Sequence, residues 1–276
     1  MSNIFAGHAN SYHGFDFEQT LDGISKAGFK YIELAAVQNW TEHVMSYMSD
    51  EELEEKKKLM AKYGITAIGM SGHCNLFDEE RLEDFKKNIV LAKKMGCKYI
   101  VTSTGEAHFG TEVVNDDLLI ENIKKVVPAL EENGIQMVLE LHGLYATGKD
   151  MLKIVKGVGS DYVRIAYNTA NIVHYADVLP TDDIKCCVDY VKYVHLKDKI
   201  GGKGVWNFPG TGNGELPLKE FMEYMDEHGY DGPYSIEIEF TEDFCMRDKD
   251  QPGDIDKANK EMADSYKYLK SLGRVE

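Results

Sequence analysis

Four short segments in the second half of the chain begin with apolar residues and end with side chains that can bind a metal ion. These segments are residues 138–142, 163–168, 193–198 and 235–239, and the candidate ligands in them are Glu140, Asn168, His195 and Glu237. Carboxylate oxygens and imidazole nitrogens suit a divalent metal, and a site that leaves coordination positions open can be catalytic. We therefore expect the chain to be a metal-dependent enzyme.

Such ligands meet only if the fold brings the ends of distant strands together. A helix-like stretch that ends in glycine recurs along the chain, and a short apolar strand follows it each time, as after Gly28 and Gly134. Glycine just past a helix permits the left-handed cap. Strands that alternate with helices in this way predict a parallel sheet with helices outside it.

The sequence predicts eight strands, near residues 4–8, 30–35, 65–71, 98–104, 136–142, 162–168, 192–197 and 234–239. It predicts helices at roughly 16–27, 50–63, 78–95, 115–132, 148–157, 181–190, 216–228 and 254–272. Eight repeats fit a (β/α)8 TIM barrel, in which the carboxyl ends of all strands face one site. An open doubly wound sheet is the competing fold, but no Gly-x-Gly-x-x-Gly turn follows the first strand. No linker interrupts the chain, so we expect a single domain over residues 1–276.

Pairs of polar residues two positions apart are informative within these strands. Because side chains alternate along a strand, Glu140 and His142 point the same way, as do Glu237 and Glu239. A carboxylate that points into a barrel is costly without a partner. The alternative to a metal site is therefore an internal network of ion pairs with Lys197 and Arg164.

The other candidate residues have weaker patterns. His195 is followed by Leu-Lys-Asp at a strand end, which favours a metal ligand over a structural histidine. Asn168 is a neutral and poorer ligand, and turn formation or helix capping explains it nearly as well. Four polar residues at or just past the ends of earlier strands either contact substrate or bind loops: His8, Glu33, His73 and Glu106. The glycine-rich segment 201–214 is either a flexible loop or a lid, and its Trp206 and Phe208 favour a cover over a ligand.

Composition and charge limit the partners that the protein can have. A hydrophobic content of 43% is typical of a soluble globular protein, and a net charge of -16 argues against an extended nucleic-acid surface. No apolar run approaches the ~20 residues of a membrane span, and the first residues lack the features of a signal peptide. The five cysteines form no zinc-type Cys-x-x-Cys pair, which indicates reduced thiols in a cytoplasmic protein. A homo-oligomer is compatible with the sequence.

These segments resemble the xylose isomerase-like barrel superfamily, the sugar phosphate isomerase/epimerase group, over essentially the whole chain. The most specific motifs are Glu-x-His at 140–142, Asn-Thr-Ala-Asn at 168–171, His-Leu-Lys-Asp at 195–198 and the glutamate of the last strand. The segment 208–215 is also similar to a Gly-x-Gly loop of the family.

The resemblance implies a ligand set for one divalent ion (Mn, Mg, Co or Zn). The family uses one Glu, one Asp, one His and a second Glu, and these roles fall on Glu140, Asn168, His195 and Glu237. Asn168 departs from the Asp of the family, which puts the metal affinity, the metal choice or the chemistry in doubt. Glu239 is the alternative to Glu237 as the last ligand.

The implied chemistry is the removal of a proton next to a carbonyl group of a small carbohydrate. A metal ion bound by a hydroxyl and the neighbouring carbonyl oxygen stabilises the resulting enediolate. Glu140 and Glu237 can act on opposite faces of the substrate, with His142 as a further acid or base. A proton returned to the other face gives a 3-epimerase, and one returned to the neighbouring carbon gives an isomerase. The expected substrate-binding residues are His8, Glu33, His73, Asn171, Lys197 and Trp206.

Three other functions are compatible with the same fold. Loss of a β-hydroxyl would make the protein a dehydratase or lyase that acts on a keto-sugar, inosose or oxidised glycoside. An apurinic endonuclease would need more metal ligands and a basic groove, which the acidic chain lacks. A sugar-binding barrel without catalysis is a further alternative, for which the neutral Asn168 is the main argument.

Overall fold

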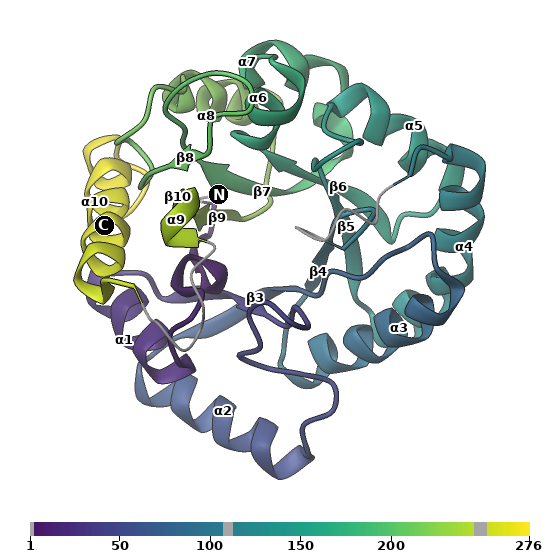
Figure 1. Cartoon of the computed structure of the whole chain (residues 1–276), viewed down its shortest axis with the longest axis horizontal. Helices are drawn as coiled ribbons and strands as arrows, with labels where there is room; N and C mark the ends of the chain where they lie inside the picture. Colours follow the sequence, from purple (N-terminus) through teal and green to yellow (C-terminus); the bar gives the residue numbers. More distant parts are fainter. Residues whose placement is uncertain (1–2, 107–112, 246–252) are drawn as a thin grey trace.

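The chain folds as a (β/α)8 barrel, as the sequence predicts. The computed structural model describes residues 3–106, 113–245 and 253–276. Eight parallel strands close into a barrel in the order β1-β2-β3-β4-β5-β6-β7-β9, and the main helices form a ring around it (Figure 1). The colours in Figure 1 run once around this ring, so that helix α1 lies beside helix α10 and the barrel closes between β1 and β9.

The barrel strands are β1 (Phe5–His8), β2 (Tyr31–Ala35), β3 (Thr66–Ser71), β4 (Tyr99–Thr102), β5 (Gln136–Glu140), β6 (Val163–Asn168), β7 (Val191–Lys197) and β9 (Tyr234–Glu237). The longer helices are α1 (Phe17–Ala27), α2 (Asp50–Lys62), α3 (Glu79–Lys94), α4 (Asp116–Asn133), α5 (Gly148–Val158), α8 (Leu218–Glu227) and α10 (Ile255–Ser271). Short elements complete the ring: η1 (Ala9–Tyr12), α6 (Asn171–Ala176), α7 (Pro180–Asp183), η2 (Ile184–Cys186), η3 (Val188–Tyr190) and α9 (Glu242–Cys245).

Local sequence signals set the ends of these helices. Asp16 and Ser49 each accept a hydrogen bond from the third helical residue, Gln19 or Glu52, whose side chain binds back to the cap. These capping boxes satisfy backbone donors that a helix start leaves unpaired. At the other end, Gly28 takes the left-handed conformation (φ 113°) that its missing Cβ permits.

One predicted helix is wrong. The sequence predicts a helix over 181–190, whereas the structure has the four-residue α7 followed by the 3-10 turns η2 and η3. Cys187 separates the two turns with φ -131° and ψ 0°, outside the helical region.

The barrel interior consists of an apolar layer with a polar layer above it. The apolar layer contains Ala6, Ile68, Val101, Val138, Ala166 and Tyr193. Two positions further along several strands, the inward side chain is polar, as in Glu140 after Val138 and His195 after Tyr193. Because inward side chains recur every two residues along a strand, the apolar layer is followed by the polar layer toward the carboxyl ends of the strands.

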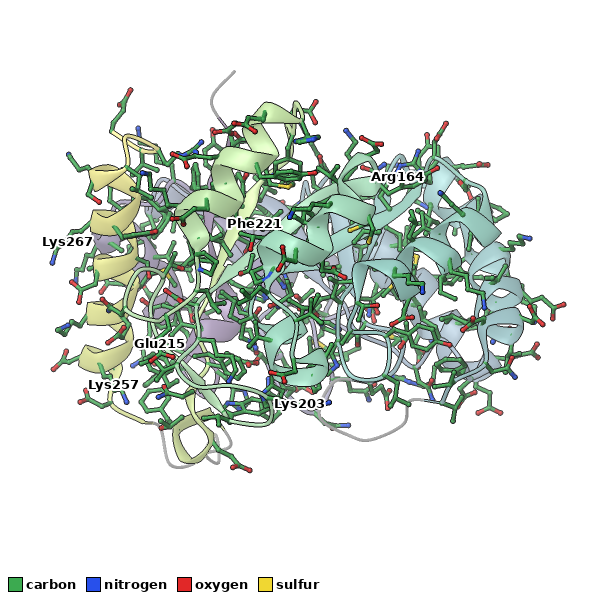
Figure 2. All side chains as sticks on the ribbon, turned by 90° about the horizontal axis from the view of Figure 1, so that it is seen from above. Arg164, Lys203, Glu215, Phe221, Lys257 and Lys267 are labelled. Atoms are coloured by element: carbon green, nitrogen blue, oxygen red, sulfur yellow. The ribbon has the colours of Figure 1, made fainter. Side chains whose placement is uncertain are left out.

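A second and larger apolar core lies between the barrel and the helices. Phe85 on α3 and Phe221 on α8 are fully buried in it, and Tyr167 of β6 stacks on Phe221 with ring centroids 5.3 Å apart. In Figure 2, Arg164 near the start of β6 and Lys203 after β7 lie toward opposite ends of the barrel. The loops that can reach the polar layer are therefore those on the side of Lys203.

The segment after β7 is anchored rather than free. Its strand β8 (Asn207–Phe208) pairs antiparallel with β10 (Phe240–Thr241), just past the end of β9. The buried Asp198 carboxylate accepts backbone N–H groups from Lys199 at 2.8 Å, Gly212 at 2.9 Å, Gly214 at 3.0 Å and Leu216 at 3.1 Å. A single side chain thus fixes both ends of the glycine-rich segment.

The described side chains also bear on redox state and membrane insertion. Cys74, Cys97, Cys186 and Cys187 are free thiols. Among the helices that the structure describes, we find none with the length and apolarity required to cross a bilayer.

We predict that Asp198→Asn destabilises the protein by about 2–4 kcal/mol, because an amide has one acceptor oxygen and its NH2 group would face buried N–H donors. Urea unfolding followed by circular dichroism would measure the loss. Asp189→Asn, at an exposed position, is the control and should change stability by less than about 0.5 kcal/mol. Equal stability of the Asp198 and Asp189 variants would contradict the anchoring role.

Candidate active site

The polar layer of the barrel is built by strand register. His8 of β1 lies beside Glu33 of β2, and Asn168 of β6 lies beside His195 of β7. Lys197 of β7 pairs in the same way with Glu237 of β9. Parallel strands end at one rim of the barrel, so residues that are far apart in sequence meet there. The predicted convergence of strand ends is present in the structure.

The imidazole of His195 occupies the centre of this layer. Its Nδ1 lies 2.8 Å from Oε1 of Glu140 and 3.4 Å from Oε2 of Glu237. Its Nε2 lies 3.0 Å from Oε2 of Glu33. All four residues are at most 5% exposed, so these contacts are shielded from water.

Electrostatics in this layer favour ionised carboxylates. Burial alone would raise the pKa of Glu140, but His195 outweighs it and lowers that pKa to about 2. The pKa of Glu33 is likewise lowered, because His195 and His8 outweigh the effect of burial. The same carboxylates raise the pKa of His195 well above its usual value, although burial acts in the opposite direction.

Asn168 connects the two central carboxylates. Its Nδ2 donates to Oε1 of Glu140 and to Oε2 of Glu237, each at 2.8 Å. Its Oδ1 accepts the backbone N–H groups of Ala170 at 3.2 Å and Asn171 at 3.0 Å, at the start of α6. These donors fix the amide orientation, so the oxygen that would bind a metal ion is turned toward the helix. This contact is the turn that the sequence left as an alternative role for Asn168, and in this orientation the amide oxygen faces backbone N–H groups.

Lys197 forms a second buried network beside the first. Its ammonium group donates to Oε1 of Glu237 at 3.2 Å and to Oε2 of Glu239 at 2.5 Å, and lies 4.3 Å from the ring centroid of Phe208. These two glutamates raise the pKa of Lys197 despite its burial. The ion-pair network considered from the sequence is therefore real for Lys197, and it shares Glu237 with the His195 cluster.

His73 is a neutral hydrogen-bond donor at the edge of the cluster. The backbone N–H of Ser103 donates to its Nδ1 at 2.9 Å, which leaves the ring proton on Nε2. That nitrogen faces Oε2 of Glu140 at 3.9 Å. Burial lowers the pKa of His73 to about 4, so the ring is uncharged near neutral pH.

A pocket opens above this layer and contains most of the predicted site residues. The predicted residues that line it are His8, His73, Glu140, His142, Asn171, His195, Lys197, Trp206 and Glu237. His142 receives a hydrogen-bond contact from the Tyr175 hydroxyl at 3.1 Å, and Asn171 donates to the Leu141 carbonyl at 3.0 Å. Trp206 and Phe208 from the anchored segment form one wall, as expected for a cover.

Three predicted residues lie elsewhere. Glu33 is fully buried one layer below the pocket, and Asn168 lies between the carboxylates, also without exposure. Neither lines the pocket among the described residues. Glu106 pairs with Arg81 at 2.7 Å outside the cluster.

The sequence analysis missed Trp40 and Tyr175 as pocket residues. Trp40 stacks on His13 with ring centroids 4.1 Å apart, and its indole N–H donates to Asn10 at 2.9 Å. Both aromatic residues follow the carboxyl end of a strand, β2 or β6, within eight residues. That position was the available signal, but single aromatic residues in loops are too common to be chosen from it alone.

The donor set fits a divalent metal ion. Ligand atoms of His8, His195 and Glu237 lie within 4.8 Å of one another, and Glu140 Oε1 approaches the same imidazole. Two carboxylates and an imidazole match the preferences of Mn²⁺, Mg²⁺, Co²⁺ or Zn²⁺. His8, which the sequence analysis assigned to substrate binding, is a geometric alternative as the further ligand.

Comparison with curated proteins finds an epimerase and a dehydratase. Fructoselysine 3-epimerase of Shigella flexneri is 24% identical over 214 residues, which cover 67% of this chain and 72% of that protein. Inosose dehydratase of Geobacillus thermodenitrificans is 22% identical over 260 residues, with 81% and 82% covered.

Solved structures share the whole fold. A D-psicose 3-epimerase crystallised in the presence of D-fructose aligns with a TM-score of 0.76 at 17% identity, covering 99% of both chains. A xylose isomerase-like protein from Mycobacterium smegmatis in complex with magnesium aligns with a TM-score of 0.74 at 17% identity, covering 99% of this chain and 96% of that one. Residues 21–272 match the family described as xylose isomerase-like TIM barrel, and the chain belongs to that family.

Proposed function

We propose that this protein is a divalent-metal-dependent sugar isomerase or 3-epimerase that removes a proton next to a carbonyl group. The main support is the convergence of Glu140, His195 and Glu237 at the floor of one pocket. The 3-epimerases among its relatives and structural neighbours support the same reaction class.

The metal would be held by Nδ1 of His195 and by one oxygen each of Glu140 and Glu237. When bound, it would supply Lewis-acid stabilisation of the negative charge that develops on the substrate oxygens. Asn168 would support both carboxylates through its NH2 group, and His8 or water would complete the coordination.

Glu140 is the candidate base for removing the proton. Its Oε1 is held by Asn168 and His195, while its Oε2 points toward His73. His73, uncharged near neutral pH, would donate its Nε2–H to a substrate oxygen. Glu237 would take a proton from solvent water and return it on the opposite face, with His142 as a further acid or base.

A dehydratase is the second candidate. The inosose dehydratase relative aligns over 81% of this chain. Lys197, between Glu237 and Glu239, is a buried ammonium group that would donate a hydrogen bond to a departing hydroxyl. The same removal of a proton by Glu140 would begin both reactions, so the fate of the neighbouring hydroxyl distinguishes them.

We predict that Glu140→Gln weakens Mn²⁺ binding at least tenfold, because it removes one of the two central charges that would bind the ion. Titration calorimetry and elemental analysis of the purified protein would measure affinity and stoichiometry. Glu121→Gln, on the exposed side of α4, is the control and should leave the affinity unchanged. Equal metal content in the Glu140 and Glu121 variants would rule out Glu140 as a ligand.

We also predict exchange of a carbon-bound substrate proton with solvent. In deuterated water with added Mn²⁺ or Mg²⁺, the wild-type protein should label the carbon next to the carbonyl group of a ketose, an inosose or an oxidised glycoside. Glu140→Gln should slow the labelling at least a hundredfold, as expected for loss of a general base. Nuclear magnetic resonance would detect the label. No labelling across such a panel would favour the non-catalytic sugar-binding barrel.

Asn168→Asp should tighten Mn²⁺ binding by about tenfold or more, because it adds a negative charge beside the ion. Without metal, the new carboxylate loses both donated hydrogen bonds and faces Glu140 and Glu237, so the metal-free protein should melt at a lower temperature. Thermal melts with Mn²⁺ and with a chelator would separate the two effects. Equal melting temperatures of the wild type and Asn168→Asp in chelator would show that the hydrogen bonds from the Asn168 amide to Glu140 and Glu237 do not stabilise the metal-free protein.

A further inference from the structure

Glu33 of β2 is a fully buried carboxylate that lies below the pocket rather than in it. Glu33 is not among the described residues that line the pocket, so its role is not a direct contact with substrate. Its Oε1 accepts the Ser71 hydroxyl at 2.8 Å and lies 3.4 Å from Nε2 of His8. Three strands therefore hold Glu33 in one orientation.

The main partner of Glu33 is the far side of the His195 ring. Nε2 of His195 lies 3.0 Å from Oε2 and 3.2 Å from Oε1 of Glu33, while Nδ1 faces Glu140 at 2.8 Å. A neutral imidazole has one N–H donor and one lone pair. In the metal-free protein, Glu140 on the Nδ1 side and Glu33 on the Nε2 side can each accept a ring proton. With an ion held at Nδ1, the one remaining ring proton would stay on Nε2, where Glu33 accepts it and fixes the ring.

We propose that Glu33 is a positioning residue that sets the tautomer and the ring orientation of His195 for metal binding, an inference that rests on the proposed function. An ionised acceptor behind a metal-binding imidazole also increases the basicity of the ligating nitrogen. Glu33 would then act on the ion through His195, without touching either ion or substrate.

A purely structural role makes a different prediction. If Glu33 only tied β2 to β7, its replacement would lower stability but would not change the protonated nitrogen of His195 or the affinity of a folded site. Glu33→Gln keeps the shape and removes the charge, so the two roles separate in a variant that still folds. Asn122→Ala is the stability control. Asn122 is as buried as Glu33, but it lies on the outer helix α4, where its side-chain amide donates to the Leu76 carbonyl.

Titration of the folded proteins with Mn²⁺ gives the first readout. Glu33→Gln should raise the Kd about 10–100-fold, the usual effect of losing such a partner, while Asn122→Ala should stay within threefold of wild type. The second readout is the ¹⁵N spectrum of histidine-labelled protein saturated with Mg²⁺, with His195→Gln for assignment. The wild type should show His195 protonated at Nε2, and Glu33→Gln should shift or broaden that signal.

Each outcome supports or overturns a stated claim. A wild-type protein that takes up no divalent ion overturns both the proposed function and this inference. Normal wild-type binding with an unchanged Kd and an unchanged His195 spectrum in Glu33→Gln overturns the inference alone. If Glu33→Gln does not fold, Glu33→Asp, which keeps the charge but shortens the reach, replaces it and should show the same weakened binding and altered His195 signal.

Discussion

The contacts of His195 with Glu33, Glu140 and Glu237 are the constraint on which the site depends. They join strands β2, β5, β7 and β9 through one ring that is almost free of solvent. Each carboxylate would be costly in a barrel without a charged or donating partner. The imidazole of His195 therefore balances the negative charges of Glu33, Glu140 and Glu237, which lie on different strands. The other residues of the polar layer surround this ring.

Asn168 shows how one atom changes such a site. An aspartate there would bring a third carboxylate to Glu140 and Glu237, and only a cation could balance the three charges. The amide instead donates to both glutamates and gives its oxygen to the start of α6. The cluster is therefore held together by hydrogen bonds even before an ion is considered, with a smaller excess of negative charge. The neutral side chain is thus compatible with the proposed metal site.

The fold could be predicted because a helix-like stretch, a glycine and a short apolar strand recur along the chain. The alternation of side chains along each strand placed Glu140, His195 and Glu237 on the inner face. The sequence could not give the depth of a side chain within the barrel. Glu33 lies in the middle of β2 and is fully buried, whereas His73 lies two residues past the end of β3 and lines the pocket. The orientation of the Asn168 amide also depends on tertiary partners, since the backbone N–H groups that fix it belong to a helix whose start the sequence did not reveal. Trp40 and Tyr175 were missed for a related reason: loop geometry brings them to the pocket.

The pairing of β8 with β10 has a consequence for how the pocket can change. Phe208 lies on β8, and its carbonyl accepts the N–H of Glu239 at 3.2 Å, while Phe240 pairs with it in register. The backbone of Phe208 is therefore tied to the segment that carries Glu237 and Glu239, so these residues move together. Under the proposed function, a substitution that reshapes the aromatic wall at Phe208 would also displace the charges around Lys197, so that substrate selectivity and acid–base chemistry would be coupled here. Trp40 belongs to the loop after β2, where the pocket lining could change without moving the β9 carboxylate.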